Sequence, residues 1–189
     1  MNISLGVLTI VPAIQHSELL AKKVAEAIAG SFGAEQADQI GVAEIDPQLS
    51  DTAAFCEHYQ VGLEQAANCV VLEAKRADKT WLVACVILAS TRADVNGLAR
   101  RTLNAKKVSF AVMEQAVAQT EMEYGAITPV GLPNDWPILV DKAVVDSKYV
   151  IIGSGVRKSK LVLLGNLLAS LPNVQVLDGL GKLSAAESC

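Results

Sequence analysis

The N-terminal third of the chain alternates short apolar runs with segments of helical periodicity. Val7–Val11 and Gly41–Ile45 are apolar runs of strand length. Between them, apolar side chains recur at helical spacing after Ser17, which predicts a helix with Ser17 as its N-cap. A further helix is predicted over Thr52–Tyr59, with Asp51 as the residue that caps it.

The middle of the chain carries the strongest strand signal. Cys69–Glu73 and Trp81–Leu88 are rich in apolar and β-branched residues and predict two strands. The polar segment Lys75–Lys79 between them suits a hairpin loop. Apolar spacing then predicts helices over Ala93–Leu103 and Met113–Thr120. These elements indicate a sheet with helices packed on it.

The last third begins with a long irregular loop over residues 125–137, because this segment contains three prolines and two glycines. An amphipathic helix is predicted over Leu161–Leu168. Three more strands are predicted, over Pro137–Asp141, Tyr149–Ile152 and Val174–Leu177. We therefore predict an α+β fold in which a single domain spans residues 1–189 and a central mixed sheet is flanked by helices.

The composition predicts an aliphatic core and no overall affinity for RNA. Apolar residues make up 51% of the chain and aromatic residues 4%, and the net charge is −4. Proteins that bind nucleic acid commonly carry a basic surplus, so any contact with RNA has to come from a local patch. The first residues lack the basic region and cleavage site of a signal peptide, and no apolar run reaches the ~18 residues of a membrane helix. The sequence thus predicts a cytoplasmic protein without a membrane segment.

The common catalytic and metal-binding patterns are missing from this sequence. It contains no GxSxG elbow, no P-loop and no HExxH motif. The two histidines, His16 and His58, have no metal-ligand residue at a useful spacing, and the cysteines form no CxxC pair. We therefore expect neither a metal ion nor another cofactor.

Two glycine-containing segments are candidates for chemistry, and each has a purely structural alternative. The Gly-x-x-x-Pro loop that starts at Gly125 could hold backbone N–H and C=O groups in a fixed frame, or it could be an ordinary loop. The segment over residues 153–160, predicted between a strand and a helix, could bind an anion or a carbonyl through Ser154. It could equally be a turn with a solvated basic face. From these residues alone, the structural alternatives are favoured.

A basic patch is the third candidate. It surrounds one end of a predicted helix and consists of Arg100, Arg101, Lys106 and Lys107. Such a patch could hold phosphate groups. It could also be a solvated helix end whose charges complement the helix dipole.

Taken in order, several segments resemble the YbaK/ProX family of aminoacyl-tRNA editing domains, which occur free-standing or attached to prolyl-tRNA synthetases. The segments are LNAKKVSFAVMEQAVAQTEMEYGAITPVGLP, PILVDKAVV and YVIIGSGVRKSKLVL. The resemblance runs from about Asn68 to Leu177, with a family-like core over about residues 60–180. The residues before it match the family only loosely.

The resemblance implies a function and a set of site residues. Members of the family hydrolyse the ester that joins a wrong amino acid to the 3′ end of a tRNA. Such an ester is already activated, so backbone donors and a positioned water or ribose hydroxyl would suffice without a nucleophilic side chain. The resemblance places Gly125 and Pro129 at the aminoacyl pocket. It assigns substrate contacts to Ala126, Ile127, Thr128, Gly153, Ser154, Gly155 and Arg157, and contacts with the tRNA acceptor stem to the basic patch.

This chain departs from the family at one important position. The family usually has a lysine in the strand before the hairpin, facing the 3′ end of the substrate, whereas this chain has Asn68 there. Asparagine forms hydrogen bonds but carries no charge. No lysine lies nearby in that strand, because Lys75 is seven residues further on. Asn68 is nevertheless predicted as a catalytic position, together with Gly125 and Pro129.

Functions of different classes stay open at this point. The first is hydrolysis of mischarged tRNA, with tRNA and an aminoacyl-tRNA synthetase as partners. The second is a non-catalytic module of the same fold that recognises an aminoacyl-tRNA end or a small amino-acid-like ligand, an alternative that Asn68 favours. A third is a structural partner of another protein, with the apolar loop over residues 130–136 as its interface.

Overall fold

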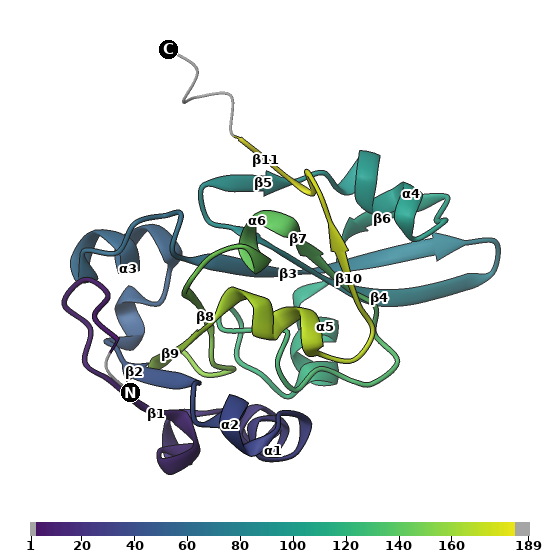
Figure 1. Ribbon diagram of the computed structural model, residues 1–189. Coiled ribbons are helices and arrows are strands. Elements are labelled where there is room, and N and C mark those ends of the chain that lie inside the picture. The colour runs from purple at the N-terminus through teal and green to yellow at the C-terminus, as the bar shows by residue number, and fades with distance from the viewer. Residues whose placement is uncertain (1–2, 184–189) are drawn as a thin grey trace.

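The computed structural model describes residues 3–183 and contains two main sheets, with helices around them (Figure 1). The larger sheet has the strand order β10 (Val174–Leu177), β7 (Ile138–Asp141), β4 (Lys79–Leu88), β3 (Ala67–Arg76) and β6 (Lys107–Phe110). Its neighbours β10, β7 and β4 run parallel, whereas β4, β3 and β6 run antiparallel. The predicted α+β class with a mixed central sheet is confirmed.

The second sheet is antiparallel. Its strand order is β1 (Ile10–Pro12), β2 (Gly41–Glu44), β9 (Ser159–Leu163) and β8 (Val150–Gly153). A bridge between Ala66 and Ile151 connects it to the larger sheet beside the start of β3. A separate two-stranded ladder joins β5 (Thr91–Ala93) to β11 (Gly181–Leu183).

The helices are short. They are α1 (Lys22–Ser31), α2 (Ala34–Ala37), α3 (Thr52–Tyr59), α4 (Arg100–Thr102), α5 (Met113–Thr120) and α6 (Lys142–Val145), and a π-helical segment over Val95–Ala99 leads into α4. Within residues 3–183, no helix has both the length and the apolar character needed to cross a membrane.

Three apolar clusters hold these layers together. The largest joins Val24 and Ile28 of α1 to Val86 of β4 and to Leu161 and Leu163 of β9. A second covers the other face of the larger sheet, and a third packs α3 against the antiparallel sheet. Their side chains are almost all aliphatic, as the composition predicts.

Two predicted helices have the predicted bounds, because their ends are set locally. The Asp51 side chain accepts the N–H of Ala53 at 3.1 Å at the start of α3, and the helix ends at Gln60 with a left-handed φ of 56°. Helix α5 likewise ends at Glu121 with φ 56°. The predicted Ser17 cap is wrong, since α1 begins only after Ala21.

The hairpin between β3 and β4 is tighter than predicted. The ladder continues to the pair Arg76 and Lys79, so the turn consists of Ala77 and Asp78 alone. The strand residues on either side of the turn are polar because this end of the hairpin is exposed to solvent, and these residues are Lys75, Arg76, Lys79 and Thr80.

The predicted helix over Leu161–Leu168 is wrong in its first half, and its second half lies in a 3₁₀ helix over Gly165–Ser170. Residues 159–163 form β9, which lies between β2 and β8 and is buried at every position. A short apolar run that is buried on both faces fits a strand and a buried helix equally well. The segment over residues 153–160 therefore connects two antiparallel strands, and no helix begins there.

The apolar loop over residues 130–136 offers little exposed apolar surface for an interface. Val130 is fully buried, and Trp136 is 3% exposed. Gly131 adopts a φ of +84°, and a Cβ there would lie 2.5 Å from the carbonyl oxygen of Lys23 on α1. The loop is thus packed into the core, and the third alternative loses its support.

Candidate functional site

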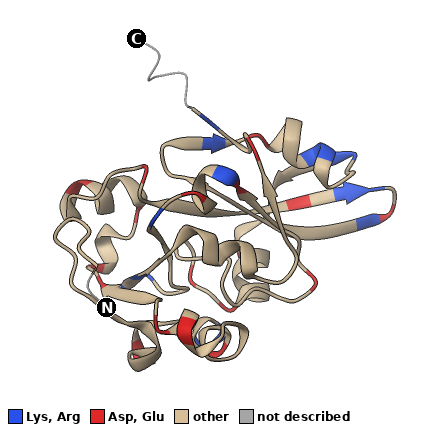
Figure 2. Cartoon of the chain, viewed as in Figure 1, with Lys and Arg blue, Asp and Glu red and all other residues tan. Residues whose placement is uncertain are grey.

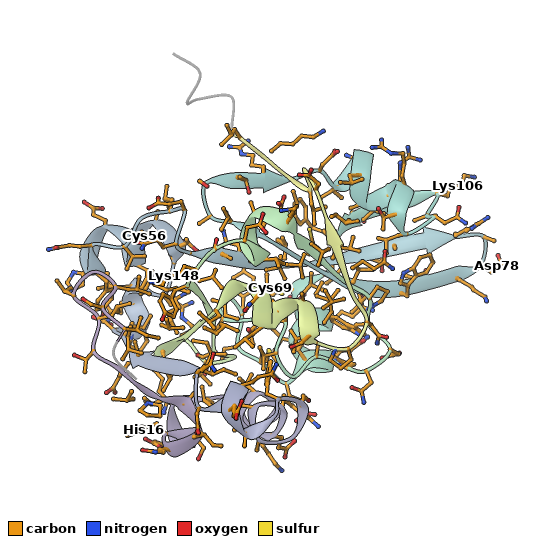
Figure 3. The ribbon with its side chains drawn as sticks, in the orientation of Figure 1. His16, Cys56, Cys69, Asp78, Lys106 and Lys148 are labelled. Carbon is orange, nitrogen blue, oxygen red and sulfur yellow. The ribbon has the colours of Figure 1, made fainter. Side chains whose placement is uncertain are left out.

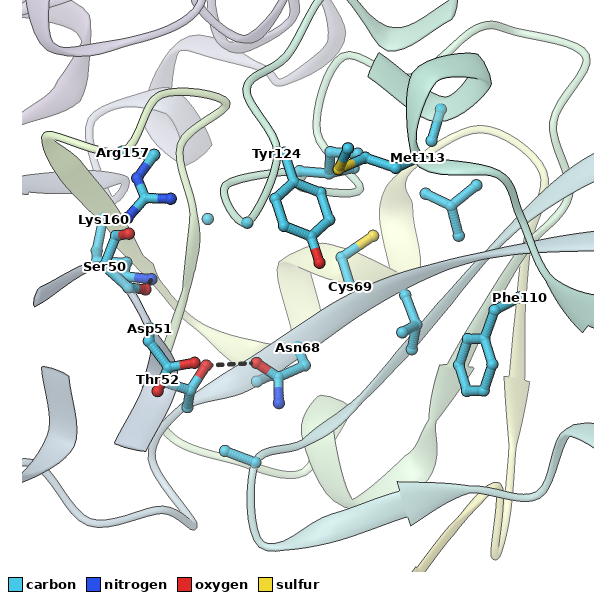
Figure 4. A pocket seen from close by; sticks show the side chains of 18 of the residues that line it. Ser50, Asp51, Thr52, Asn68, Cys69, Phe110, Met113, Tyr124, Arg157 and Lys160 are labelled. Atoms are coloured by element: carbon cyan, nitrogen blue, oxygen red, sulfur yellow. Dashed lines mark hydrogen bonds between the residues drawn. The ribbon is translucent and has the colours of Figure 1, made fainter. Parts of the chain in front are cut away.

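A pocket of about 900 Å³ opens beside the first half of β3, where that strand has no partner on one side (Figure 4). Strand β6 pairs with β3 only over residues 72–75. In a ladder, successive residues direct their N–H and C=O groups alternately to the two sides. Since the C=O of Val71 points to the β6 side and accepts the N–H of Ala111, Cys69 directs its backbone groups to the same side. The pocket thus has a bare strand edge as one wall.

Three other parts of the chain complete the pocket. One wall is the start of α3, a second is α5 with the loop that follows it, and a third is the connection between β8 and β9 (Figure 4). The residues that carry polar side chains along these walls include Ser50, Asp51, Thr52, Arg157 and Lys160. Segments that are far apart in sequence therefore meet at one site.

Asn68 lies on the floor of this pocket, and its side chain is held in place. The hydroxyl of Thr52 donates to Asn68 Oδ1 at 2.7 Å (Figure 4). Because the amide oxygen is engaged, the NH₂ group is the part of Asn68 that is available to a ligand. The start of α3 therefore orients the asparagine that the sequence resemblance aligns with the lysine of the family.

The Gly-x-x-x-Pro loop forms the opposite wall through Gly125 and Ile127. Gly125 adopts φ +82°, a conformation that other L-residues rarely adopt, and open space surrounds the position of a Cβ. Gly153 of β8 lies directly behind this loop, since a Cβ there would collide with the carbonyl oxygens of Ala126 and Ile127. The N–H of Gly155 donates to the Ala126 carbonyl at 2.9 Å and ties the two segments together.

The structure separates the predicted substrate contacts into two groups. Asn68, Gly125, Ile127, Gly153 and Arg157 line the pocket. The others, Ala126, Thr128, Pro129, Ser154 and Gly155, are buried behind its walls. The Thr128 hydroxyl is buried without a hydrogen-bond partner in the described residues, yet it does not line the pocket.

Ser154 has a structural environment that its sequence context did not show. Its hydroxyl lies 2.7 Å from the Ser159 hydroxyl and 2.9 Å from the Ser159 carbonyl oxygen, and the side chain is fully buried. The Ser159 hydroxyl in turn donates to the carbonyl of Leu19. This chain of hydrogen bonds fastens the β8–β9 connection to the segment before α1 and leaves Ser154 away from the pocket.

Lys160 is the main pocket residue that sequence reasoning missed. It is 8% exposed, its Nζ donates to the Ser50 carbonyl at 2.9 Å, and the ammonium lies 5.2 Å from the Phe55 ring centroid. Burial lowers the pKa of Lys160 below its ordinary value. The prediction placed Lys160 on a solvated basic face, because it took the following segment for a helix.

Cys69 lines the pocket with a thiol, but the thiol is not activated. Burial raises the pKa of Cys69 far above its ordinary value, so the side chain stays protonated near neutral pH. Among the described residues, no cluster of three or more histidine, cysteine, aspartate or glutamate side chains could hold a metal ion.

The mouth of the pocket carries exposed apolar side chains. Phe110 is 66% exposed, Tyr124 62% and Met113 44%, and all three line the pocket. Figure 4 shows Tyr124 and Met113 on one side of Cys69 and Phe110 beyond it. Exposed aromatic rings at the mouth of a cavity are suited to stacking on an unpaired base.

The predicted basic patch lies further along the same strands. Lys107 of β6 pairs directly with Lys75 of β3, and Arg76 pairs with Lys79 across the hairpin. Like charges placed opposite each other in a sheet are unfavourable. The Glu73 carboxylate, 2.8 Å from Lys75 Nζ, offsets the first pair, so the pair of Arg76 and Lys79 is the one that favours a bound anion. Figure 2 shows the same concentration of Lys and Arg at α4 and the hairpin end, and Figure 3 places Lys106 there, away from Cys69. At about 3.3 Å per residue, Lys75 is roughly 23 Å along β3 from Asn68.

Comparison with known proteins identifies the class to which this fold and pocket belong. Residues 46–171 match the model of the aminoacyl-tRNA editing domain, and the chain is therefore a member of that family. A comparison with curated protein sequences gives no match.

Solved structures share the fold. One is a protein proposed to be a trans-editing enzyme for prolyl tRNA synthetase, with 17% identity and a TM-score of 0.69 over 87% of this chain and 99% of that protein. Another is the hypothetical protein APE2540, with 18% identity and a TM-score of 0.72 over 85% of this chain and 100% of that protein.

Proposed function

We propose that this protein hydrolyses, in trans, the ester of mischarged aminoacyl-tRNA. The observation that carries the proposal is the pocket in which Asn68 and the bare edge of β3 face the loop of Gly125. All three lie within the part of the chain that matches the editing-domain family. The structural similarity to a protein proposed to be a trans-editing enzyme for prolyl tRNA synthetase supports the same function.

The pocket offers neutral donors for the ester carbonyl. The backbone N–H of Cys69 points to the pocket side of β3, and the NH₂ group of Asn68 lies one residue away. Donors fixed in this way stabilise the oxyanion that forms when an ester is attacked. Water supplies the nucleophile, because the Cys69 thiol stays protonated. Its attack breaks the ester bond and releases the amino acid and the ribose hydroxyl, and the vicinal ribose hydroxyl would orient the water.

The surroundings of the pocket fit a single-stranded RNA end. Phe110 and Tyr124 would stack on the terminal bases at the mouth. The basic patch, extended by Arg76 and Lys79, would contact the phosphates of the acceptor stem. With a net charge of −4, the protein would bind tRNA weakly by itself, so a synthetase is a plausible second partner. We expect this activity in the cytoplasm, where protein synthesis uses acylated tRNAs.

A second candidate function is a binding module without turnover. It is favoured by Asn68, which supplies a hydrogen bond where the family usually supplies a charge. Such a module would hold an aminoacyl-tRNA end or an amino-acid-like ligand in the same pocket.

Deacylation of a panel of mischarged tRNAs at micromolar protein and low salt tests the proposal. The site variants are Asn68→Ala and Gly125→Val. The matched control is Gly179→Val, because Gly179 also has a positive φ, +75°, with open space around its Cβ position, and lies outside the pocket. A left-handed valine costs each protein about 1–2 kcal/mol of stability.

We expect turnover of at least one substrate by the wild type and the Gly179 variant, and loss of it in both site variants. Equal loss in the two valine variants would mean that strain alone abolishes activity. If no substrate is hydrolysed while charged tRNA still binds, the second candidate replaces the first.

A further inference from the structure

Lys160 is a buried cation without a carboxylate partner. It projects from the central strand β9, is 8% exposed, and forms no ion pair within residues 3–183. Lysine is rarely buried unless it is paired, because removing an ammonium group from water is costly. The Nζ has three donors, and the Ser50 carbonyl engages one of them. Free donors and unbalanced charge therefore remain at this end of the pocket.

The charged groups nearby do not balance Lys160. Arg157 lines the same end of the pocket, and its guanidinium donates to the Pro47 carbonyl at 3.1 Å (Figure 4). The nearest acidic residue on the wall is Asp51, whose carboxylate accepts the N–H of Ala53 at the start of α3. The phenyl ring of Phe55 offers only its face to the ammonium. The Glu123 carboxylate accepts the backbone N–H of Arg157 at 2.6 Å but does not line the pocket. Among the described residues of the wall, two cations thus face the cavity beside one carboxylate.

We propose that Lys160 and Arg157 form an anion-binding subsite that takes the 5′-phosphate of the 3′-terminal nucleotide of tRNA. The inference rests on the proposed function, because that phosphate is attached to the ribose that carries the ester. A phosphate offers several acceptors to the free Nζ donors, and charge-assisted hydrogen bonds are the strong ones. Arginine adds a planar set of donors suited to phosphate. The subsite supplies, from β9, a positive charge that Asn68 on β3 does not supply.

Binding of adenosine 5′-monophosphate and of adenosine, measured by calorimetry with the full chain, tests this subsite. The key variant is Lys160→Met, which keeps the length of the side chain and removes its charge. Lys158→Met is the control, because Lys158 is exposed in the same connection and does not line the pocket. Lys160→Arg tests whether a positive charge alone suffices, and circular dichroism checks that each variant is folded.

We expect the wild type and the Lys158 variant to bind the monophosphate about 10-fold or more tightly than adenosine. That ratio should fall toward 1 in Lys160→Met and be largely kept in Lys160→Arg. If Lys160→Met does not fold, Arg157→Gln provides the test, since the exposed Arg157 side chain is outside the core and its loss should reduce the ratio.

Three results would overturn the subsite. They are equal binding of the two ligands by the wild type, an unchanged ratio in Lys160→Met, and no binding of the monophosphate at millimolar concentration. If free aspartate or glutamate binds more tightly than the monophosphate, and Lys160→Met loses this binding, then Lys160 and Arg157 hold an amino-acid carboxylate instead. Because no turnover is measured, failure here is distinguishable from failure of the deacylation test.

Discussion

Replacing Ser154 by alanine should weaken the fold and leave the pocket intact. The hydroxyl of Ser154 is fully buried and hydrogen-bonds within the β8–β9 connection, with Ser159 at 2.7 Å. Its removal deletes one buried hydrogen bond and leaves a carbonyl less well satisfied, which costs about 1–2 kcal/mol. Ser159 still donates to Leu19, so no buried donor is orphaned. For a chain of this length the loss corresponds to a Tm lower by about 2–8 °C.

The assay combines thermal unfolding with deacylation, or with binding of charged tRNA where no turnover is found. For Ser154→Ala we expect the lower Tm and a kcat/KM within about twofold of the wild type. Asn68→Ala should show the converse, a nearly unchanged Tm and a large loss of activity. Removing a hydroxyl that stabilised the oxyanion would cost about 10²–10³ in rate. Such a loss in Ser154→Ala at unchanged Tm would refute the placement of Ser154 behind the pocket wall.

Two further predictions concern charge. Burial lowers the pKa of Lys160 below 10.5, so the folded state binds that proton more weakly than the unfolded state does. The stability of the wild type should therefore rise relative to that of Lys160→Met as the pH rises through the folded-state pKa toward 10.5. The pKa of the neighbouring Cys56 thiol is raised, so that thiol stays protonated over the lower part of this pH range. Urea unfolding of both proteins between pH 7 and 10 measures the difference in their free energies of unfolding, and a difference that does not change with pH would contradict the prediction. For tRNA binding, Lys107→Gln should reduce the slope of log K against log salt by about 1, whereas Lys148→Gln, distant from the patch, should leave it unchanged. Equal slopes for all three proteins would remove Lys107 from the RNA contact.

Local signals were sufficient where a single segment determines its own structure. Helices α3 and α5 have their predicted bounds because each ends at a residue with a left-handed backbone, and the Asp51 side chain also caps the start of α3. The β3–β4 hairpin follows from two β-rich runs, although its polar end conceals how far the strands continue. The order of motifs along the chain is also sufficient to identify the family.

Segments whose burial depends on distant partners were not predictable in the same way. The residues of β9 are apolar at short range, and only the pairing with β2 and β8 distinguishes a central strand from a buried helix. The roles of Ser154 and Lys160 changed with that one correction. Ser154 is a buried residue that connects, through Ser159, to the segment before α1. Lys160, expected on a solvated face, lies in the pocket.

The aliphatic core, the α+β class, the family and the glycine loop beside the pocket all follow from the order of amino acids along the chain. The set of residues that meet in the pocket follows from the packing of the folded chain, because the pocket joins the start of α3, the free edge of β3 and the β8–β9 connection. Ser50 and Lys160 are 110 residues apart in the chain, yet they share a hydrogen bond of 2.9 Å. A contact of that kind depends on how α3 packs against the antiparallel sheet, and no local pattern of hydrophobic and polar residues encodes it.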